Sequence, residues 1–303
     1  MKKVAWITDD FYLQHDTVGH PESLERLESI NYHMERLIEK LIVVEPYVAK
    51  VEDVEMIHSS EMIAIVKDKA SEELPIDADT TLSKQSYGVA LKAVGAGLVA
   101  VDGLKNSEFE RAFCAVRPPG HHATPTESMG FCLFNNIAVT AKYAQNEGYS
   151  KVMIIDFDVH HGNGTQDAFY DDDSVFYFST HQLFAYPGTG NETETGAGKG
   201  VGYTANFPLM PNSSDSEYME VYGDELSKLY EFFNPDIILV SAGYDLHESD
   251  PLAQMDVTRD GIRKIVRSIL DLGDKPVIFF LEGGYSVNEL GLNVVATVEE
   301  MLE

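Results

Sequence analysis

Short apolar runs alternate with amphipathic stretches along the whole chain. Consecutive apolar residues, which are typical of strands buried on both faces, occupy 4–8, 112–116, 151–157, 175–178, 236–241 and 277–281. Apolar residues at helical spacing occupy 23–41, 52–70 (as two short helices), 83–104, 136–148, 164–170, 215–233, 259–272 and 287–302. This alternation predicts an α/β fold with a mainly parallel sheet and helices on both faces.

Two segments interrupt the alternation. Residues 71–81 are acidic and contain proline, and residues 181–204 are rich in glycine. A loop as long as the second one is more often functional than idle in a compact domain. No linker-like break in composition occurs elsewhere, and 303 residues with 44% hydrophobic content suffice for a full core. We therefore predict one domain over 1–303.

The chain is strongly acidic, with 50 acidic against 22 basic residues and a net charge of -28. This charge argues against nucleic acid as a partner and favours cationic substrates such as polyamines or lysine-rich peptides, although solubility alone is also a sufficient reason for it. Only two cysteines, Cys114 and Cys132, are present, and we expect them to be small buried hydrophobes in a reducing cytoplasm. Asp9 and Asp10 break the first apolar run, so we expect no signal peptide, and we expect no membrane-spanning segment of about 20 apolar residues.

An acid-acid-histidine string follows the strand predicted over 151–157. Asp156, Asp158 and His160 alternate in sequence, so their side chains emerge on one face of an extended chain. Asp245 follows another predicted strand, and with Asp158 and His160 it forms our candidate ligand set. Three protein ligands with one open position are typical of catalytic zinc, while the oxygen-rich set also suits Fe(II) or Mn(II). Taken alone, this string is weak evidence for a metal site, because acids at strand ends also serve as helix caps.

Candidate acid-base and hydrogen-bonding residues lie at two further strand ends. His121 and His122 follow an Arg-Pro-Pro-Gly string whose prolines stiffen the loop, and adjacent histidines can divide acid and base duties. Tyr285 follows Gly283 and Gly284, and its phenol could stabilise an oxyanion. Each of these residues taken alone is more often structural. Ligands in open α/β sheets bind beyond the carboxyl ends of the strands, so four such ends indicate one catalytic pocket.

Taken together, these strings resemble the histone deacetylase superfamily, which includes bacterial and archaeal histone-deacetylase-like amidohydrolases and acetylpolyamine amidohydrolases. The resemblance rests on 20–22, 25–27, 117–122, 130–132, 135–136, 156–166, 187–190, 241–245, 250–252 and 283–285. It implies a three-layer αβα, arginase/deacetylase-like fold and hydrolysis of the N-acetyl amide of an aliphatic amine. The Asp-Phe-Asp-Val run and Asn163 are closer to the class II branch than to class I.

The resemblance also implies roles for the candidate residues. Zinc would be held by Asp158, His160 and Asp245. His122 would act as general base and then as acid, and Tyr285 would hydrogen-bond the polarised carbonyl.

Two further residues would orient the histidine pair. His121 would pair with Asp156 and tune the electrostatics of the site. Asn163 stands where class I members carry an aspartate that orients the second histidine. Such a neutral partner stabilises imidazolium less and so lowers the pKa of His122.

The family further implies a substrate slot and bound potassium. Phe131 and Tyr186 would wall an acetyl-lysine slot, the Gly130 carbonyl and Gly283 would lie near the substrate amide, Leu252 would stand at the rim, and Arg26 would lie below the metal near the acetate exit. One potassium ion would involve Asp156, Asp158, His160, Ser179 and Thr180. A second would involve Phe169, Asp172, Val175 and Tyr203.

Several alternatives stay open at this point. A binuclear manganese ureohydrolase would need two more aspartates, at positions that hold Gly162 and His247. His247 itself could be a rim contact or an occasional extra ligand. The compact chain lacks an evident long insertion near its start, which favours acetyl-lysine in peptides or proteins, with acetylpolyamine as the alternative substrate. A pseudo-deacetylase that only binds acetylated amines is the non-enzymatic alternative, and the oligomeric state stays open.

Overall fold

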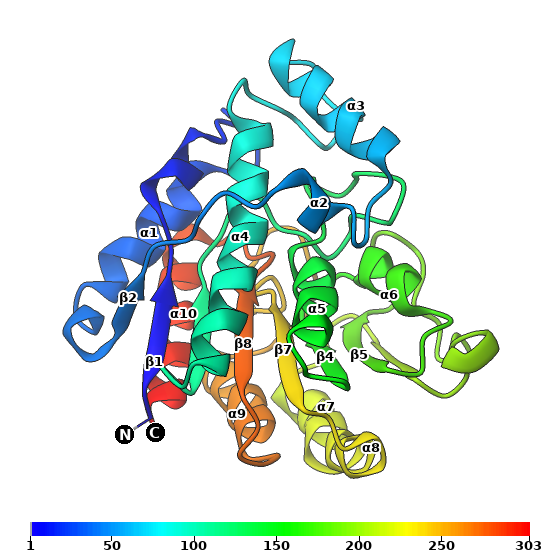
Figure 1. Cartoon of the computed structure of the whole chain (residues 1–303). Helices are drawn as coiled ribbons and strands as arrows, with labels where there is room; N and C mark the ends of the chain where they lie inside the picture. Colours follow the sequence, from blue (N-terminus) through cyan, green and yellow to red (C-terminus); the bar gives the residue numbers. More distant parts are fainter. Residues whose placement is uncertain (1) are drawn as a thin grey trace.

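The computed structural model describes residues 2–303, in which eight strands form one sheet and every strand pairing is parallel (Figure 1). The strands follow the order β2-β1-β3-β8-β7-β4-β5-β6 across the sheet. Their bounds are β1 Val4–Ile7, β2 Ile42–Val44, β3 Arg111–Cys114, β4 Val152–Asp156, β5 Val175–Gln182, β6 Thr204–Leu209, β7 Ile237–Ala242 and β8 Val277–Leu281. The predicted α/β class with a mainly parallel sheet is confirmed.

Helices cover both faces of this sheet. Helices α4 and α5 pack together in front of it in the view of Figure 1, whereas α1, α10 and α9 lie behind it. The helices are α1 Leu24–Met34, α2 Val51–Val54, α3 Ser60–Ser71, α4 Ser86–Lys105, α5 Asn136–Asn146, α6 Asn163–Phe169, α7 Asp215–Glu220, α8 Leu226–Phe233, α9 Arg259–Leu270 and α10 Val287–Leu302, with a π-helical turn at Val221–Glu225 that joins α7 to α8. Short 3₁₀ helices occupy Asp10–Gln14, Ile38–Lys40 and Gly198–Gly200.

The central strands are buried along their whole length. All residues of β4, β7 and β8 are buried, because helices cover both faces and leave no solvated side. This burial explains why these strands appear in the sequence as unbroken apolar runs. Both cysteines are free and fully buried, as expected.

The two strands that the sequence did not reveal are the two edges of the sheet. Strand β2 has only three residues, and Val43 in it is 59% exposed. Strand β6 is half-buried and contains Pro208, which is tolerated in edge strands. The helix predicted over 23–41 was also too long, because α1 ends at Met34 so that the chain can return to pair β2 with β1.

Contrary to the expectation from the sequence, helix α4 is long and apolar enough, by length and composition, to cross a membrane. However, 78% of its apolar window is buried inside the fold, where it contacts β3, α5 and the short helix Asp10–Gln14. Packing within the core accounts for its apolar character.

Candidate active site

The carboxyl ends of four neighbouring strands bring the predicted residues together. In the register of the sheet, Asp156 at the end of β4 pairs with Ser241 on β7, and Ala242 on β7 pairs with Leu281 on β8. The segments that follow these strand ends carry Asp158, His160, Asp245 and Gly283, and the loop after β3 carries the two adjacent histidines. The parallel sheet therefore places these motifs together at the carboxyl ends of its strands, as expected.

Asp158, His160 and Asp245 form a compact cluster of potential metal ligands. One ligand atom from each of them lies within 4.8 Å of the others. His160 Nδ1 is 3.0 Å from Asp245 Oδ2 and 3.3 Å from Asp158 Oδ1. The remaining carboxylate oxygens are held by backbone amides, since the Gly283 N–H donates to Asp158 Oδ2 (2.8 Å) and the Val159 N–H donates to Asp245 Oδ1 (3.0 Å). The two carboxylates are thus oriented toward the imidazole, as a metal site requires.

The electrostatics of this cluster also fit a cation. Burial and the charge of Asp158 raise the pKa of Asp245 to about 7. Burial acts to lower the pKa of His160, but hydrogen bonds to and charges of Asp158 and Asp245 outweigh it and raise that pKa to about 10. A divalent cation would replace the proton on His160 as the partner of the two carboxylates, because metal ligands bind deprotonated.

The adjacent histidines have different hydrogen-bonding partners. His121 Nδ1 is 3.0 Å from Asp156 Oδ2, and His122 Nδ1 is 2.8 Å from Asn163 Oδ1. An amide oxygen only accepts, so His122 Nδ1 must donate, which leaves Nε2 of the neutral ring as a proton acceptor. The structure thus places each histidine beside the partner that the resemblance implied, His121 beside Asp156 and His122 beside Asn163.

These surroundings shift the two histidines in opposite directions. Burial acts to lower the pKa of His121, but the charges of Asp158, Asp156 and Glu282 raise it to about 10. Burial, together with the positive charges of His121 and His160, lowers the pKa of His122 well below its usual value. At neutral pH one ring is therefore a cation and its neighbour is neutral and able to accept a proton.

Tyr285 lies over a buried arginine at the same carboxyl end of the sheet. The Arg26 guanidinium carbon is 5.0 Å from the centre of the Tyr285 ring, and Arg26 donates to the carbonyls of Gly284 (2.7 Å) and Glu282 (2.5 Å). Burial raises the pKa of Tyr285 well above its usual value, despite the opposing charge of Arg26. The phenol therefore stays protonated and can donate a hydrogen bond at neutral pH.

A pocket of about 260 Å³ opens above these residues. It is lined by Asp79, Pro119, His121, His122, Gly130, Phe131, Asp158, His160, Tyr186, Leu252, Gly283 and Tyr285. Phe131 meets Tyr285 edge to face with ring centres 5.8 Å apart, and Tyr186 meets His122 in the same way at 5.1 Å. The predicted slot residues thus share one pocket with the candidate catalytic residues, and Leu252 is exposed at its margin.

Two glycines are required by close approach in this pocket. A side chain at Gly130, where φ is +56°, would lie 2.6 Å from the His122 ring. A side chain at Gly283 would lie 2.3 Å from Asp245 Oδ2. Any larger residue at either position would displace a candidate catalytic or metal-binding side chain.

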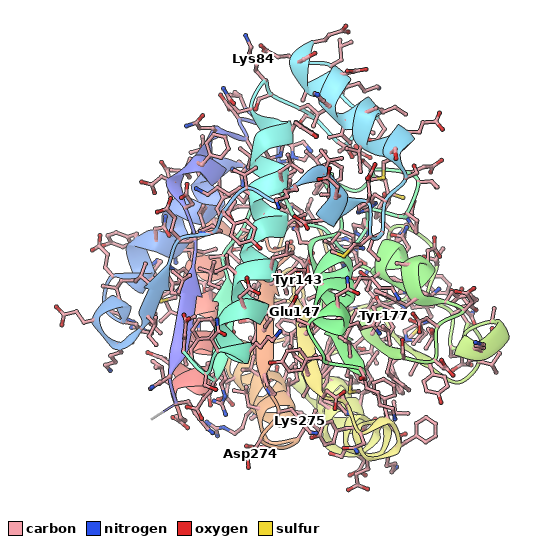
Figure 2. The ribbon with its side chains drawn as sticks, viewed as in Figure 1. Lys84, Tyr143, Glu147, Tyr177, Asp274 and Lys275 are labelled. Atoms are coloured by element: carbon pink, nitrogen blue, oxygen red, sulfur yellow. The ribbon has the colours of Figure 1, made fainter. Side chains whose placement is uncertain are left out.

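Two residues that support the site were not predicted from the sequence. Glu282, which is fully buried, accepts hydrogen bonds from the backbone N–H groups of Gly120 (2.7 Å) and His121 (3.2 Å), and burial raises its pKa to about 7. The Tyr177 hydroxyl (labelled in Figure 2) donates to Asp156 Oδ2 at 3.1 Å. A buried acid directly after a strand was a signal for the first residue, whereas nothing local marks the second.

The other predicted residues are placed as follows. Ser179 on β5 pairs with Asp156 in the sheet, and its hydroxyl is 2.9 Å from His181 Nδ1. Thr180 Oγ1 lies 3.0 Å from the Tyr222 hydroxyl. The second proposed potassium set, Phe169, Asp172, Val175 and Tyr203, lies around the connection from α6 to β5 and beside β6. Potassium binding stays a prediction at both places.

His247 lies outside the ligand cluster. Its Nδ1 is 2.8 Å from the Ser249 hydroxyl, which donates in turn to Ser286. It is absent from the residues that line the pocket among the described part of the chain. The bridging aspartates of a binuclear site have no counterpart at His247 or at Gly162.

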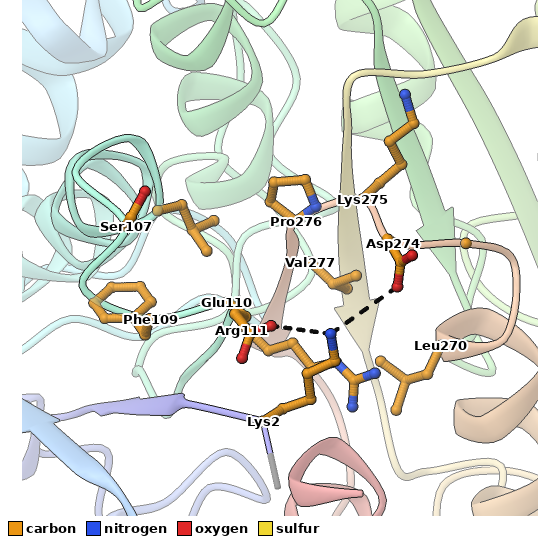
Figure 3. Close-up of a pocket in the computed structure, with 12 residues that line it drawn as sticks. Lys2, Ser107, Phe109, Glu110, Arg111, Leu270, Asp274, Lys275, Pro276 and Val277 are labelled. Carbon is orange, nitrogen blue, oxygen red and sulfur yellow. Dashed lines mark hydrogen bonds and ion pairs between the residues drawn. The ribbon is translucent and has the colours of Figure 1, made fainter.

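A second pocket, of about 200 Å³, lies at the opposite end of the sheet, where β3 and β8 begin (Figure 3). Its two acids lie beside a lysine: Lys2 Nζ is 2.9 Å from Glu110 and 4.0 Å from Asp274. Arg111 donates to the Met301 carbonyl at 2.7 Å at the end of α10. These pairings give the second pocket a structural explanation.

Comparisons with known proteins identify the family. The model of the histone deacetylase domain matches residues 20–301. The chain belongs to the histone deacetylase family. A probable deacetylase of Archaeoglobus fulgidus is 38% identical over 288 residues, which cover 91% of this chain and 79% of that protein. A probable deacetylase of Methanothermobacter thermautotrophicus is 40% identical over 290 residues, covering 94% and 86% of the two chains.

A solved structure supports the same assignment. The crystal structure of the HDA15 HD domain superposes with a TM-score of 0.95 at 32% identity and covers 99% of this chain and 89% of that one. The resemblance inferred from the motifs and the arginase/deacetylase-like fold are therefore confirmed. Proteins of the histone deacetylase family are generally zinc-dependent, and the cluster of Asp158, His160 and Asp245 fits such an ion.

Proposed function

We propose that this protein is a zinc-dependent deacetylase that hydrolyses the N-acetyl amide of acetyl-lysine in peptides or proteins to the free amine and acetate. The observation that carries the proposal is the convergence of a three-residue ligand cluster, of which Asp158 and His160 line the pocket, with two oppositely tuned histidines and a protonated tyrosine that line the same pocket. Each group that amide hydrolysis needs is present there, which disfavours a protein that only binds acetylated amines.

Zinc would be held by Asp158, His160 and Asp245, whose ligand atoms converge within 4.8 Å. In such a three-ligand site the ion supplies Lewis acidity, which acidifies a water ligand and polarises a carbonyl oxygen. The backbone amides of Gly283 and Val159 hold the two carboxylates in place for this task.

His122 is the residue that we propose moves the proton. Its Nδ1–H is fixed by Asn163, so Nε2 takes a proton from the attacking water and later delivers it to the leaving amine. Its lowered pKa keeps Nε2 free at neutral pH. Delivery to the amine is favourable for the same reason, because a weakly basic imidazole is a good acid once it is protonated.

His121 and Tyr285 would stabilise the charge that develops on the carbonyl oxygen. The raised pKa of His121 keeps that ring cationic beside Asp156, close to the ligand cluster. The Tyr285 phenol is a protonated donor on the pocket wall, and a donor aimed at a developing oxyanion contributes about 10²–10³ in rate.

The shape of the pocket supports a linear amide on an aliphatic chain. Phe131 and Tyr186 give it aromatic walls, which suit the methylene chain of lysine, while the polar groups lie below them. An acetylated polyamine has a similar aliphatic chain. The net charge of -28 and Asp79 in the pocket lining keep acetylpolyamines as the second candidate substrates.

The test is a side-by-side measurement of kcat/KM for an acetyl-lysine peptide and for N-acetylputrescine or acetylspermidine, with zinc-loaded protein at physiological potassium. A clear preference for the peptide supports the proposal. A preference for the small amines would make the protein a polyamine amidohydrolase, and inactivity on all of them would contradict deacetylation of either class.

A further inference from the structure

A third cavity, distinct from the pocket at the amino end of the sheet, adjoins the candidate active-site pocket. It has a volume of about 350 Å³ and lies between helix α3, residues 76–77 and residues 126–129. Met129 lines this cavity, while the next residue, Gly130, lines the active-site pocket. Likewise Asp77 lines the cavity and Asp79 lines the pocket. The two hollows therefore share the same two chain segments as a dividing wall.

Hydrogen bonds fix this dividing wall. The Asp77 carboxylate accepts from the backbone N–H groups of Asp79 (2.9 Å) and Thr80 (2.7 Å), which closes a tight turn. The Phe131 N–H then donates to the Thr80 hydroxyl at 3.3 Å and joins the turn to the segment after Gly130. The wall is thus a built part of the fold, and its two sides keep a fixed relation to each other.

The cavity has an apolar floor and an acidic margin. Met62, Ile65, Ile76 and Met129 supply apolar side chains, and Ile65 is 44% exposed although it lies on the same helix as buried Met62. Asp77 and Glu127 are exposed at its margin. Flexible methionine side chains adapt to different apolar shapes, which suits a surface that accepts more than one sequence.

We infer that this cavity is a docking groove for residues that flank the acetyl-lysine of a peptide substrate, with preference for an apolar side chain and a neighbouring Lys or Arg. The inference rests on the proposed deacetylase function and specifies its substrate class. An extended peptide advances about 3.3 Å per residue, and consecutive residues, Met129 and Gly130, line the groove and the pocket, so residues near an acetyl-lysine in the pocket would lie beside the groove. The acidic margin complements basic residues.

Continuity with the pocket selects a peptide over other occupants. An acetylated polyamine presents no apolar side chain beside its aliphatic chain, so it leaves the floor of the groove unused. The acidic margin repels nucleic acid and anionic lipid surfaces. Met129 also links the groove to the proposed general base His122. Its sulfur lies 3.5 Å from Nδ2 of Asn163, and Oδ1 of the same asparagine accepts a hydrogen bond from His122.

Binding of short peptides tests the groove without depending on turnover. The probes are a set of fluorescent glycine peptides with a central acetyl-lysine. Each peptide carries a single leucine at one of the three nearest positions on either side, and the reference peptide carries none. Binding is measured by fluorescence anisotropy with the Tyr285→Phe protein. At one or more of these positions, leucine should tighten Kd by about tenfold, the scale of a gained apolar contact in a binding pocket. Ile65→Asp should abolish this gain, and Ile65→Leu should keep it.

Tyr32→Asp is the matched control, because Tyr32 is an exposed apolar residue on α1 (71% exposed) that lies outside the groove. It should leave the gain intact. Adding an arginine beside the best leucine should tighten binding further, and Glu127→Lys should reverse that increment. If leucine has no effect at any position, or if its effect survives Ile65→Asp, the inference is overturned.

Turnover by the wild-type protein separates this inference from the proposed function. If the peptides are hydrolysed with no dependence on flanking residues in kcat/KM or Kd, the deacetylase proposal stands and the groove is refuted. If the peptides bind with the expected preference and none is hydrolysed, the groove stands and the deacetylase proposal fails.

Discussion

The two ends of the sheet differ in how their charged residues are buried and paired. At the amino end, a pocket of about 200 Å³ contains Lys2, Glu110 and Asp274 in opposite-charge pairs at the surface. At the carboxyl end, a pocket of about 260 Å³ lies over three buried carboxylates, of Asp156, Asp158 and Asp245. The two pockets have similar volumes, so volume does not distinguish a functional site from a structural hollow.

Unbalanced buried charge is what distinguishes them. Burying like-charged carboxylates together is unfavourable unless a cation or a proton compensates them. Here the compensation comes from His121 and His160, whose pKa values are raised to about 10, whereas the pKa of the neighbouring His122 is lowered well below 6.5. Strongly perturbed groups that converge in a pocket are a mark of chemistry, whereas the paired charges at the other end stabilise the fold modestly or not at all.

Removing one carboxylate from each end should have the largest and the most unequal effects. Asp245→Ala deletes a proposed metal ligand, so zinc content should drop and deacetylase activity should fall to the level of protein-free buffer. Asp274→Ala, the matched control at the amino end, removes an exposed acid whose partner Lys2 stays paired with Glu110. It should change neither. Elemental analysis and an activity assay check both variants, and full zinc occupancy in Asp245→Ala would refute the ligand assignment.

Tyr285→Phe separates hydrogen bonding from charge at the carboxyl end. The ring and its contacts with Phe131 and Arg26 stay, and only the phenolic hydroxyl is lost. Turnover should fall by about 10²–10³ while zinc content stays unchanged. The measurement is kcat on an acetylated substrate alongside elemental analysis. Activity close to that of the wild type would rule out the oxyanion role.

Asn163→Asp tests the tuning of His122. A carboxylate at Nδ1 stabilises the imidazolium, so the pKa of His122 should rise, on the order of one unit. Because the reaction needs the neutral ring, the acid limb of the kcat/KM profile should move to higher pH by a similar amount. Activity near the alkaline plateau should survive. An acid limb that stays in place would show that His122 is not the group that titrates there.

Buried His58 offers a smaller, pH-dependent contrast. Its Nδ1 is 2.9 Å from the Thr124 carbonyl, its Nε2 accepts from the Asn135 N–H (2.8 Å), and burial lowers its pKa to about 4. Because the folded pKa lies below the unfolded value near 6.5, the stability is fully present above pH 6.5 and is lost as the pH falls toward 4. The loss from this one residue should reach about 3 kcal/mol near pH 4.

His58→Gln checks the assignment, because glutamine removes the titration. Chemical unfolding across this pH range should show a free energy of unfolding that depends less steeply on pH in the variant than in the wild type. His33→Gln, at a half-buried position on α1, serves as the control. Identical pH dependence in the His58 variant and the wild type would remove His58 as a source of acid sensitivity.

Burial decided which strands the sequence could reveal. Strands β4, β7 and β8 are covered on both faces, so each appears as an apolar run that predicted it correctly. Strands β2 and β6 lie at the edges with mixed or exposed side chains, and nothing local distinguishes them from loops. Their formation depends on pairing with β1 and β5, which is information from distant parts of the chain.

The site follows the same division. The candidate ligands and the histidine pair could be proposed because Asp158 lies two residues from His160, His121 is adjacent to His122, and Asp245 follows another predicted strand. Glu282 and Tyr177 escaped notice because their roles come from partners far along the chain: Gly120 for the first residue and Asp156 for the second. The docking groove beside Met129 depends on the spatial meeting of α3 with two loops, which no sequence pattern marks.

The proposed deacetylation depends on a zinc ion held by the cluster of Asp158, His160 and Asp245 at the carboxyl end of the sheet. The most direct test measures zinc per chain and deacetylation of an acetyl-lysine peptide in the purified protein, after chelation and after zinc is added back. We predict one zinc per chain, loss of activity with loss of zinc, and recovery of both on reloading. Full activity in protein freed of metal would contradict the account.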